Sequence, residues 1–148
     1  MRGGKVSVLI ATADRPDLLS DCLAHLRRSR FAEAEVLILD QSRDVHRVEE
    51  ENGFPQRGLR HFCLPRRGKS AALNFGLGEA RGDLLAFTDD DCRVSEEWLD
   101  VMYRAFLETG GRTALTGRVQ GGELEAGAVM APSLLDEDLP KEYSPAAF

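Results

Sequence analysis

The stretch VSVLIAT, residues 6–12, decides the fold class of this 148-residue chain because Val, Leu and Ile dominate it. Short apolar runs of this kind are typical of strands that are covered on both faces of a parallel sheet. EVLILD at residues 35–40 has the same character. GLRHFCL at 58–64 and DLLAFTD at 83–89 indicate two more strands, the first of them less apolar. The sequence therefore predicts four strands, and TALTGRVQ at 113–120 is a further candidate strand.

Helical patterns follow three of these strands. Residues 15–29 repeat Leu and Cys at helical spacing, with Pro16 near the start. Residues 69–80 predict a second helix despite two glycines, and residues 95–108 predict a third with Ser95 as its N-cap. This alternation predicts an open α/β sheet with helices on both faces, and ligands of such sheets bind at the carboxyl ends of the strands.

The composition excludes several classes of protein. With 43% hydrophobic and 30% charged residues, a chain of this length builds a core without disulfides or a structural metal. Its net charge of -6 argues against general binding of nucleic acid. Three scattered cysteines fit reduced thiols in a cytosol. No run reaches the roughly 20 apolar residues of a membrane span, so we expect a cytoplasmic protein without a transmembrane segment.

Polar and acidic residues follow three of the predicted strands. They are Thr12, Asp14 and Arg15 after the first, Asp40 after the second, and Asp89, Asp90 and Asp91 after the fourth. Three successive carboxylates repel one another unless a cation is present, and Mg²⁺ or Mn²⁺ takes carboxylate oxygens together with substrate phosphates. A polar turn is the alternative interpretation of the triplet. Its position directly after a buried strand favours the metal site.

A cationic loop, RRGKS at residues 66–70, follows the third strand. It is not a Walker loop, because that motif would need glycine where the chain has Cys63. Two interpretations remain: a basic surface patch, or the start of a helix whose free N–H groups and cations bind a diphosphate. The acidic triplet favours the second.

Together these segments resemble the inverting family 2 glycosyltransferases, which use nucleotide-diphospho-sugar donors and have the Rossmann-like GT-A fold. VSVLIATADRPDLL is similar to the family's opening strand and turn, and EVLILDQSRD to its acidic second-strand end. GKSAALNFGLGEARGDLLAFTDDDC is similar to its long central signature, which is highly specific. The resemblance implies a nucleotide-sugar-binding core at residues 1–121, and an irregular, acidic, Gly-rich segment at 122–148.

The resemblance also implies a role for each candidate residue. Thr12, Asp14 and Arg15 would line the nucleotide pocket, Asp40 would accept hydrogen bonds from the base, and Arg67, Gly68, Lys69 and Asn74 would lie near the nucleotide and sugar. Asp89 would point toward the ribose and, with Asp91, form a D-x-D metal site, with Asp90 as a rival ligand. The chain departs from the family at Asp14, where asparagine is common, and at Leu73, where many members have arginine.

The implied reaction is direct displacement at the anomeric carbon of a UDP-, GDP- or dTDP-type sugar donor, assisted by Mg²⁺ or Mn²⁺. The acceptor, a saccharide or a lipid carrier, is not identified. No motif in this chain matches the acidic pair that contains the family's catalytic base. We therefore expect the catalytic base beyond Phe148. We also expect a sheet that is truncated at the C-terminus. A homo-oligomer and peripheral association with the inner membrane face remain open.

The alternative is a non-catalytic module, a truncated or degenerate domain that binds a nucleotide or a partner protein. A nucleotidyltransferase or dehydrogenase on a similar sheet is disfavoured, because no GxGxxG follows the first strand.

Overall fold

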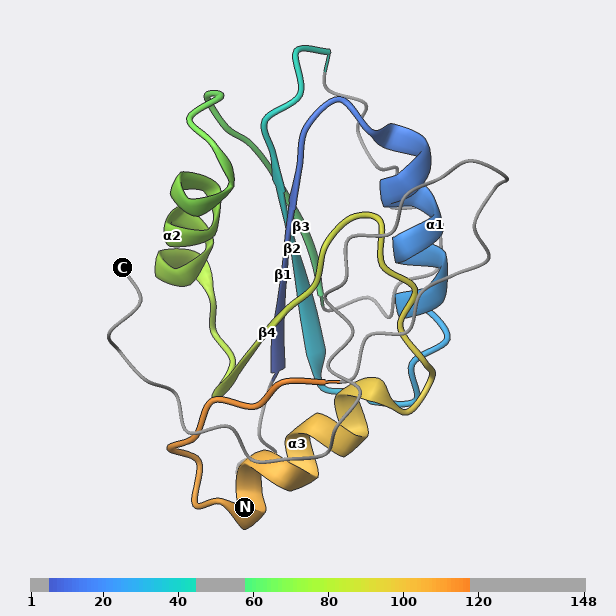
Figure 1. Cartoon of the computed structure of the whole chain (residues 1–148), viewed down its shortest axis with the longest axis vertical. Coiled ribbons are helices and arrows are strands. Elements are labelled where there is room, and N and C mark those ends of the chain that lie inside the picture. The colour runs from blue at the N-terminus through green and yellow to red at the C-terminus, as the bar shows by residue number, and fades with distance from the viewer. Residues whose placement is uncertain (1–5, 45–57, 118–148) are drawn as a thin grey trace, which may run out of the picture. The chain divides into compact units, whose positions relative to one another are not determined.

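The computed structural model describes residues 6–44 and 58–117 of the chain (Figure 1). The chain divides into one compact unit, Met1–Thr113, and a second unit, Ala114–Phe148. Of the second unit only residues 114–117 are described, and they form no helix or strand. In the described ranges, none of the helices has the length and apolar character that crossing a bilayer requires.

All four predicted strands are present: β1 (Val6–Thr12), β2 (Ala34–Asp40), β3 (Leu59–Cys63) and β4 (Leu84–Phe87). They form one parallel sheet in the order β3-β2-β1-β4. The apolar runs of β1 and β2 occupy its centre, which explains why their residues are almost all buried. The carboxyl ends of the strands therefore meet at one edge of the sheet.

Three helices cover the two faces of the sheet, as the alternating pattern predicts. They are α1 (Pro16–Leu26), α2 (Lys69–Glu79) and α3 (Trp98–Glu108). Figure 1 shows α1 and α3 on one side of the sheet and α2 on the other. The first face packs Val8, Ile10 and Ile38 against α1 and α3, and the second packs Leu9, Leu37 and Leu39 against α2.

Two sequence predictions are wrong in detail. The third helix begins at Trp98 rather than at Ser95, because Ser95 accepts a hydrogen bond from the Trp98 N–H in a preceding turn and gives no side-chain cap. The strand predicted at residues 113–120 is absent from its described part, residues 113–117. A strand needs a paired neighbour, and β4 pairs with β1 alone among the described strands. The remainder of that prediction lies outside the described residues.

Helix α2 packs closely on the sheet because its buried face is made of small residues. Ala72 and Gly76 are the buried residues of α2. A Cβ added at Gly76 would lie 2.7 Å from Leu39 Cδ1 and 2.8 Å from Leu9 Cδ2, well inside van der Waals contact. Gly78, on the outer side of the same helix, has no atom within 4 Å of such a Cβ. The two glycines that weaken the helical pattern therefore have different surroundings.

We expect Gly76→Ala and Gly78→Ala to change stability in opposite directions. Overpacking at residue 76 costs about 1–3 kcal/mol, which exceeds the about 0.5–1 kcal/mol that alanine gains over glycine within a helix. At residue 78 only the helical gain remains. Urea unfolding, monitored by circular dichroism, should show a lower midpoint for Gly76→Ala and a higher one for Gly78→Ala. Equal midpoints would contradict the close packing of α2.

Candidate functional site at the carboxyl ends of the strands

A buried carboxylate lies where β1 and β4 end. Leu9 pairs with Phe87 in the register of these strands, so three more residues along each chain bring Thr12 level with Asp90. The Thr12 hydroxyl donates to Asp90 Oδ2 at 2.6 Å. Asp90 is 0% exposed. The middle acid of the triplet therefore points into the protein.

Arg15 is the cation that accompanies this carboxylate. Its Nη2 lies 2.6 Å from Asp90 Oδ1, at an angle outside hydrogen-bond geometry, so the contact is an ion pair. Its Nη1 donates to Asp91 Oδ2 at 3.3 Å. Arg15 is the N-cap residue of α1, and Pro16 occupies the first helical position after it. One half-exposed guanidinium thus joins the buried acid to an exposed one.

Lys69 pairs with the first acid of the triplet, since its Nζ contacts Asp89 Oδ1. Lys69 is the first residue of α2, and Gly68 before it has φ 92°, a conformation that favours glycine. Both members of the pair are about half-exposed. The structure therefore brings the cationic loop and the acidic triplet together, each flanking acid with its own cation.

Asp14 organises the turn between β1 and α1 and ties it to two other loops. Its backbone has φ 56°, and its N–H donates to Ser42 Oγ at 2.8 Å. Its Oδ1 accepts from the Arg43 N–H at 2.8 Å, and its Oδ2 lies 2.5 Å from Arg66 Nη1. The Arg43 N–H first, and then Arg66, hold the pKa of Asp14 below its usual value. This carboxyl therefore stays ionised at neutral pH.

Asp40 lies at the same edge but faces inward. It is 3% exposed. Its Oδ1 accepts from the Ser42 N–H at 2.8 Å, and its Oδ2 lies 3.0 Å from His61 Nε2. His61 was not among the candidates. Strand parity explains the contact, because His61 pairs in register with Ile38, two residues before Asp40, and so faces the same side of the sheet.

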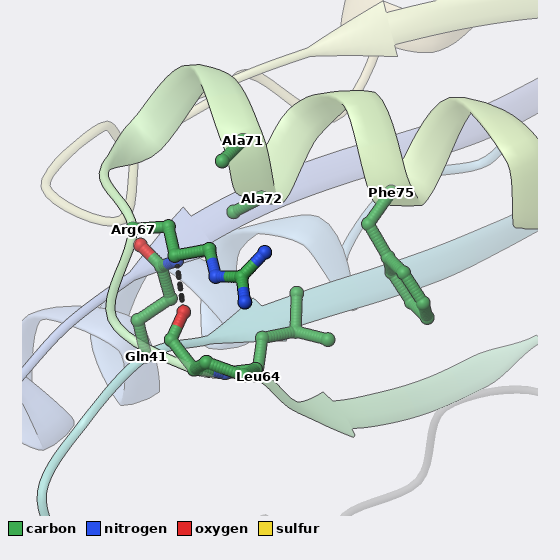
Figure 2. A pocket seen from close by; sticks show the side chains of 7 residues that line it. Gln41, Leu64, Arg67, Ala71, Ala72 and Phe75 are labelled. Carbon is green, nitrogen blue, oxygen red and sulfur yellow. Dashed lines mark hydrogen bonds between the residues drawn. The ribbon is translucent and has the colours of Figure 1, made fainter.

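A small pocket opens between α2 and the ends of β2 and β3 (Figure 2). Its volume is about 240 Å³, and it is lined by Gln41, Leu64, Pro65, Arg67, Ala71, Ala72 and Phe75. Gln41 donates to the Pro65 carbonyl at 2.7 Å. Figure 2 shows the Arg67 guanidinium beside the mainly apolar wall. Arg67 thus lines this pocket, and Gln41 and Phe75 are lining residues that were not predicted from the sequence.

The last candidate, Asn74, is exposed on α2 about one and a half turns beyond Lys69. It lies on the same helix as Lys69 but farther from the start of that helix.

The exposed acids are suited to bind a metal ion whose coordination shell is completed by the substrate. Within the described ranges, no group of three or more His, Cys, Asp or Glu side chains is arranged to hold a metal. The side chains of Asp89 and Asp91 are 49% and 48% exposed and lie in one loop. Mg²⁺ and Mn²⁺ commonly take one or two carboxylates and complete their coordination with substrate phosphates and water. The donor set fits that arrangement.

Replacing the Thr12 hydroxyl should expose the importance of the buried contact. Thr12→Val keeps the side-chain shape but leaves Asp90 Oδ2 without its donor, which costs about 1–3 kcal/mol. Thr12→Ser keeps the hydroxyl and loses one methyl group, which costs about 0.8 kcal/mol. Free energies of unfolding in urea should rank wild type, Thr12→Ser and Thr12→Val in that order. A valine variant as stable as the serine variant would show that the hydrogen bond contributes little.

Cys22 provides a reporter beneath the triplet. Its thiol contacts the Asp89 carbonyl at 3.5 Å, and burial raises its pKa to about 12. Cys63 is exposed and Cys92 intermediate. Since the thiolate is the reactive form, we expect a thiol reagent at pH 8 to modify Cys63 and Cys92 in the folded protein, and Cys22 only after unfolding. Three fast equivalents without denaturant would contradict the burial of Cys22.

Comparison with known proteins finds relatives among glycosyltransferases. The family model described as Glycosyl transferase family 2 matches residues 7–132. EpsH of Bacillus subtilis (strain 168) is 27% identical over 143 residues, which are 93% of this chain and 41% of EpsH. Glycosyltransferase GlyG of Streptococcus pneumoniae serotype 4 is 22% identical over 70% of this chain and 35% of GlyG. The chain thus spans less than half the length of these two curated relatives.

Solved structures show the same fold. The crystal structure of S. aureus TarS 1-349 in complex with UDP-GlcNAc superposes with a TM-score of 0.62 at 26% identity, covering 70% of this chain and 31% of that one. Mannosyltransferase PcManGT from Pyrobaculum calidifontis, in complex with GDP-Man and Mn²⁺, gives a TM-score of 0.52 at 21% identity, over 65% of this chain and 32% of that one. With its parallel Rossmann-like GT-A sheet, this chain belongs to glycosyl transferase family 2.

Proposed function

We propose that this chain binds the nucleotide-diphospho-sugar donor of a metal-dependent, inverting glycosyltransferase. The observation that carries the proposal is the meeting of two cations and three carboxylates at one sheet edge, through Arg15 with Asp90 and Asp91 and through Lys69 with Asp89. A nucleoside diphosphate with a divalent ion presents both signs of charge. It therefore suits a site that contains both.

The relatives support the donor class. TarS was solved with UDP-GlcNAc and PcManGT with GDP-Man and Mn²⁺, so both protein structures hold a sugar nucleotide. In this chain we place the nucleobase of the donor at the carboxyl end of β2. Asp40 uses one lone pair toward the Ser42 N–H and one toward His61, and an ionised carboxylate offers about four. Asp40 therefore retains the capacity to accept hydrogen bonds from the nucleobase of the donor.

The three acids differ in exposure, and we assign their roles on that basis. We assign Asp89 and Asp91 to the ribose and the metal, because their carboxylates face solvent. Asp90 is buried and holds Thr12 and Arg15 in place, so we assign it a positioning role. Mg²⁺ or Mn²⁺, when bound, would offset the negative charge that grows on the departing diphosphate.

The cations act on the same leaving group. Lys69, at the N-terminus of α2, is followed by free helix N–H groups, which favour an anion. Arg15 offers a planar guanidinium that can bind two phosphate oxygens at once. Together they would hold the diphosphate in place while the bond to the sugar breaks. We assign the base that deprotonates the acceptor to a part of the protein outside the described residues.

Isothermal titration with UDP, GDP and dTDP, with and without Mn²⁺, tests the proposal. We expect one of the three nucleotides to bind, at least about tenfold more tightly with Mn²⁺ than without it, a change of about 1.4 kcal/mol. Asp91→Asn should remove most of the Mn²⁺ effect because it removes a charged ligand. Asp100→Asn is the matched control, since Asp100 pairs with Arg104 within α3. Failure of all three nucleotides to bind would reject the proposal.

A further inference from the structure

We propose that Arg15 and Lys69 are internal counter-ions that pass from the acids of the triplet to the diphosphate when the donor arrives. The divalent ion would then bind tightly together with the nucleotide and only weakly before it. This inference rests on the proposed function and concerns the order in which the site is filled.

Each flanking acid has a cation beside it in the structure. Lys69 Nζ contacts Asp89 Oδ1, and Arg15 Nη1 lies 3.3 Å from Asp91 Oδ2. Arg15 Nη2 also pairs with buried Asp90. Two positive and three negative side chains leave these five groups with a formal charge of -1. A bare divalent ion therefore meets acids that are largely neutralised.

The two contacts of Arg15 are unequal, and this inequality defines which one is released. The contact with Asp90 measures 2.6 Å and its acid is 0% exposed, whereas the contact with Asp91 measures 3.3 Å and its acid is 48% exposed. Exposed ion pairs contribute little to stability because water screens them. Asp90 thus holds the guanidinium near the site, while the link to Asp91 is weak enough to exchange.

The Lys69 contact is equally suited to exchange. The side chains of Lys69 and Asp89 are 58% and 49% exposed, so both are solvated and weakly held. Phosphate oxygens carry full charge and accept charge-assisted hydrogen bonds from ammonium and guanidinium groups. A diphosphate that binds Lys69 and Arg15 leaves Asp89 and Asp91 free, and adds its own oxygens as metal ligands. One binding event would then create the metal site.

A Mn²⁺ titration followed by the electron paramagnetic resonance signal of the free ion tests this order of binding. The full chain is titrated alone and with a saturating amount of the nucleotide that binds best. We expect the protein and the nucleotide together to bind Mn²⁺ at least about tenfold more tightly than the sum of their separate affinities for the ion. Lys69→Met should tighten Mn²⁺ binding without nucleotide about two- to fivefold, the size of one exposed ion pair.

Arg66→Met is the matched control variant. It lies in the same loop and removes the same charge, but Arg66 pairs with Asp14 rather than with the triplet. We expect it to leave nucleotide-free Mn²⁺ binding unchanged within about 1.5-fold, and thermal melts to show both variants folded. Both residues are exposed at the surface, so folding is not at risk.

The outcomes separate this inference from the proposed function. If Mn²⁺ alone binds as tightly as Mn²⁺ with nucleotide, while nucleotide binding persists, the counter-ion exchange is overturned and donor binding stands. Equal effects of Lys69→Met and Arg66→Met would also overturn it, because the general field would then explain both. If no nucleotide binds under any condition, the proposed function and this inference fail together.

Discussion

The buried contact between Thr12 and Asp90 is the constraint on which the site depends. A carboxylate that is 0% exposed must be hydrogen-bonded and paired, and here Thr12 and Arg15 meet those needs. The contact fixes the loop after β4 against the end of β1. It also turns the acids on either side, Asp89 and Asp91, toward solvent. One residue that touches no ligand in our assignment thus orients the two that would.

The same edge depends on how closely α2 approaches the sheet. Gly76 lets the helix lie against Leu9 and Leu39, and Gly68 lets the chain turn sharply before it. These features place Lys69 beside the loop that carries Asp89. A bulkier residue at the buried glycine would move the helix start and the lysine with it. Packing in the core therefore controls the charge pattern at the surface.

Much of the fold could be predicted from the sequence, and the reasons lie in particular segments. VSVLIAT and EVLILD are apolar enough to be central strands whatever surrounds them. The Thr12–Asp90 contact was not predictable, because it requires the register between β1 and β4, which depends on tertiary packing. His61 and Gln41 escaped notice for the same reason: strand parity and neighbouring loops bring them to the site. Ser95 is a residue type that commonly caps helices, but the chain forms a turn there before the helix begins.

Asp14 has the left-handed backbone conformation that asparagine and aspartate tolerate better than other non-glycine residues. The asparagine common at this position in the resembling family and the aspartate of this chain therefore satisfy the same steric requirement. They differ in charge, however, and only the acid can form an ion pair with Arg66. The two residue types therefore suit the same turn with different charges, and exchanging one for the other would change the charge at the carboxyl end of the sheet while keeping the backbone conformation.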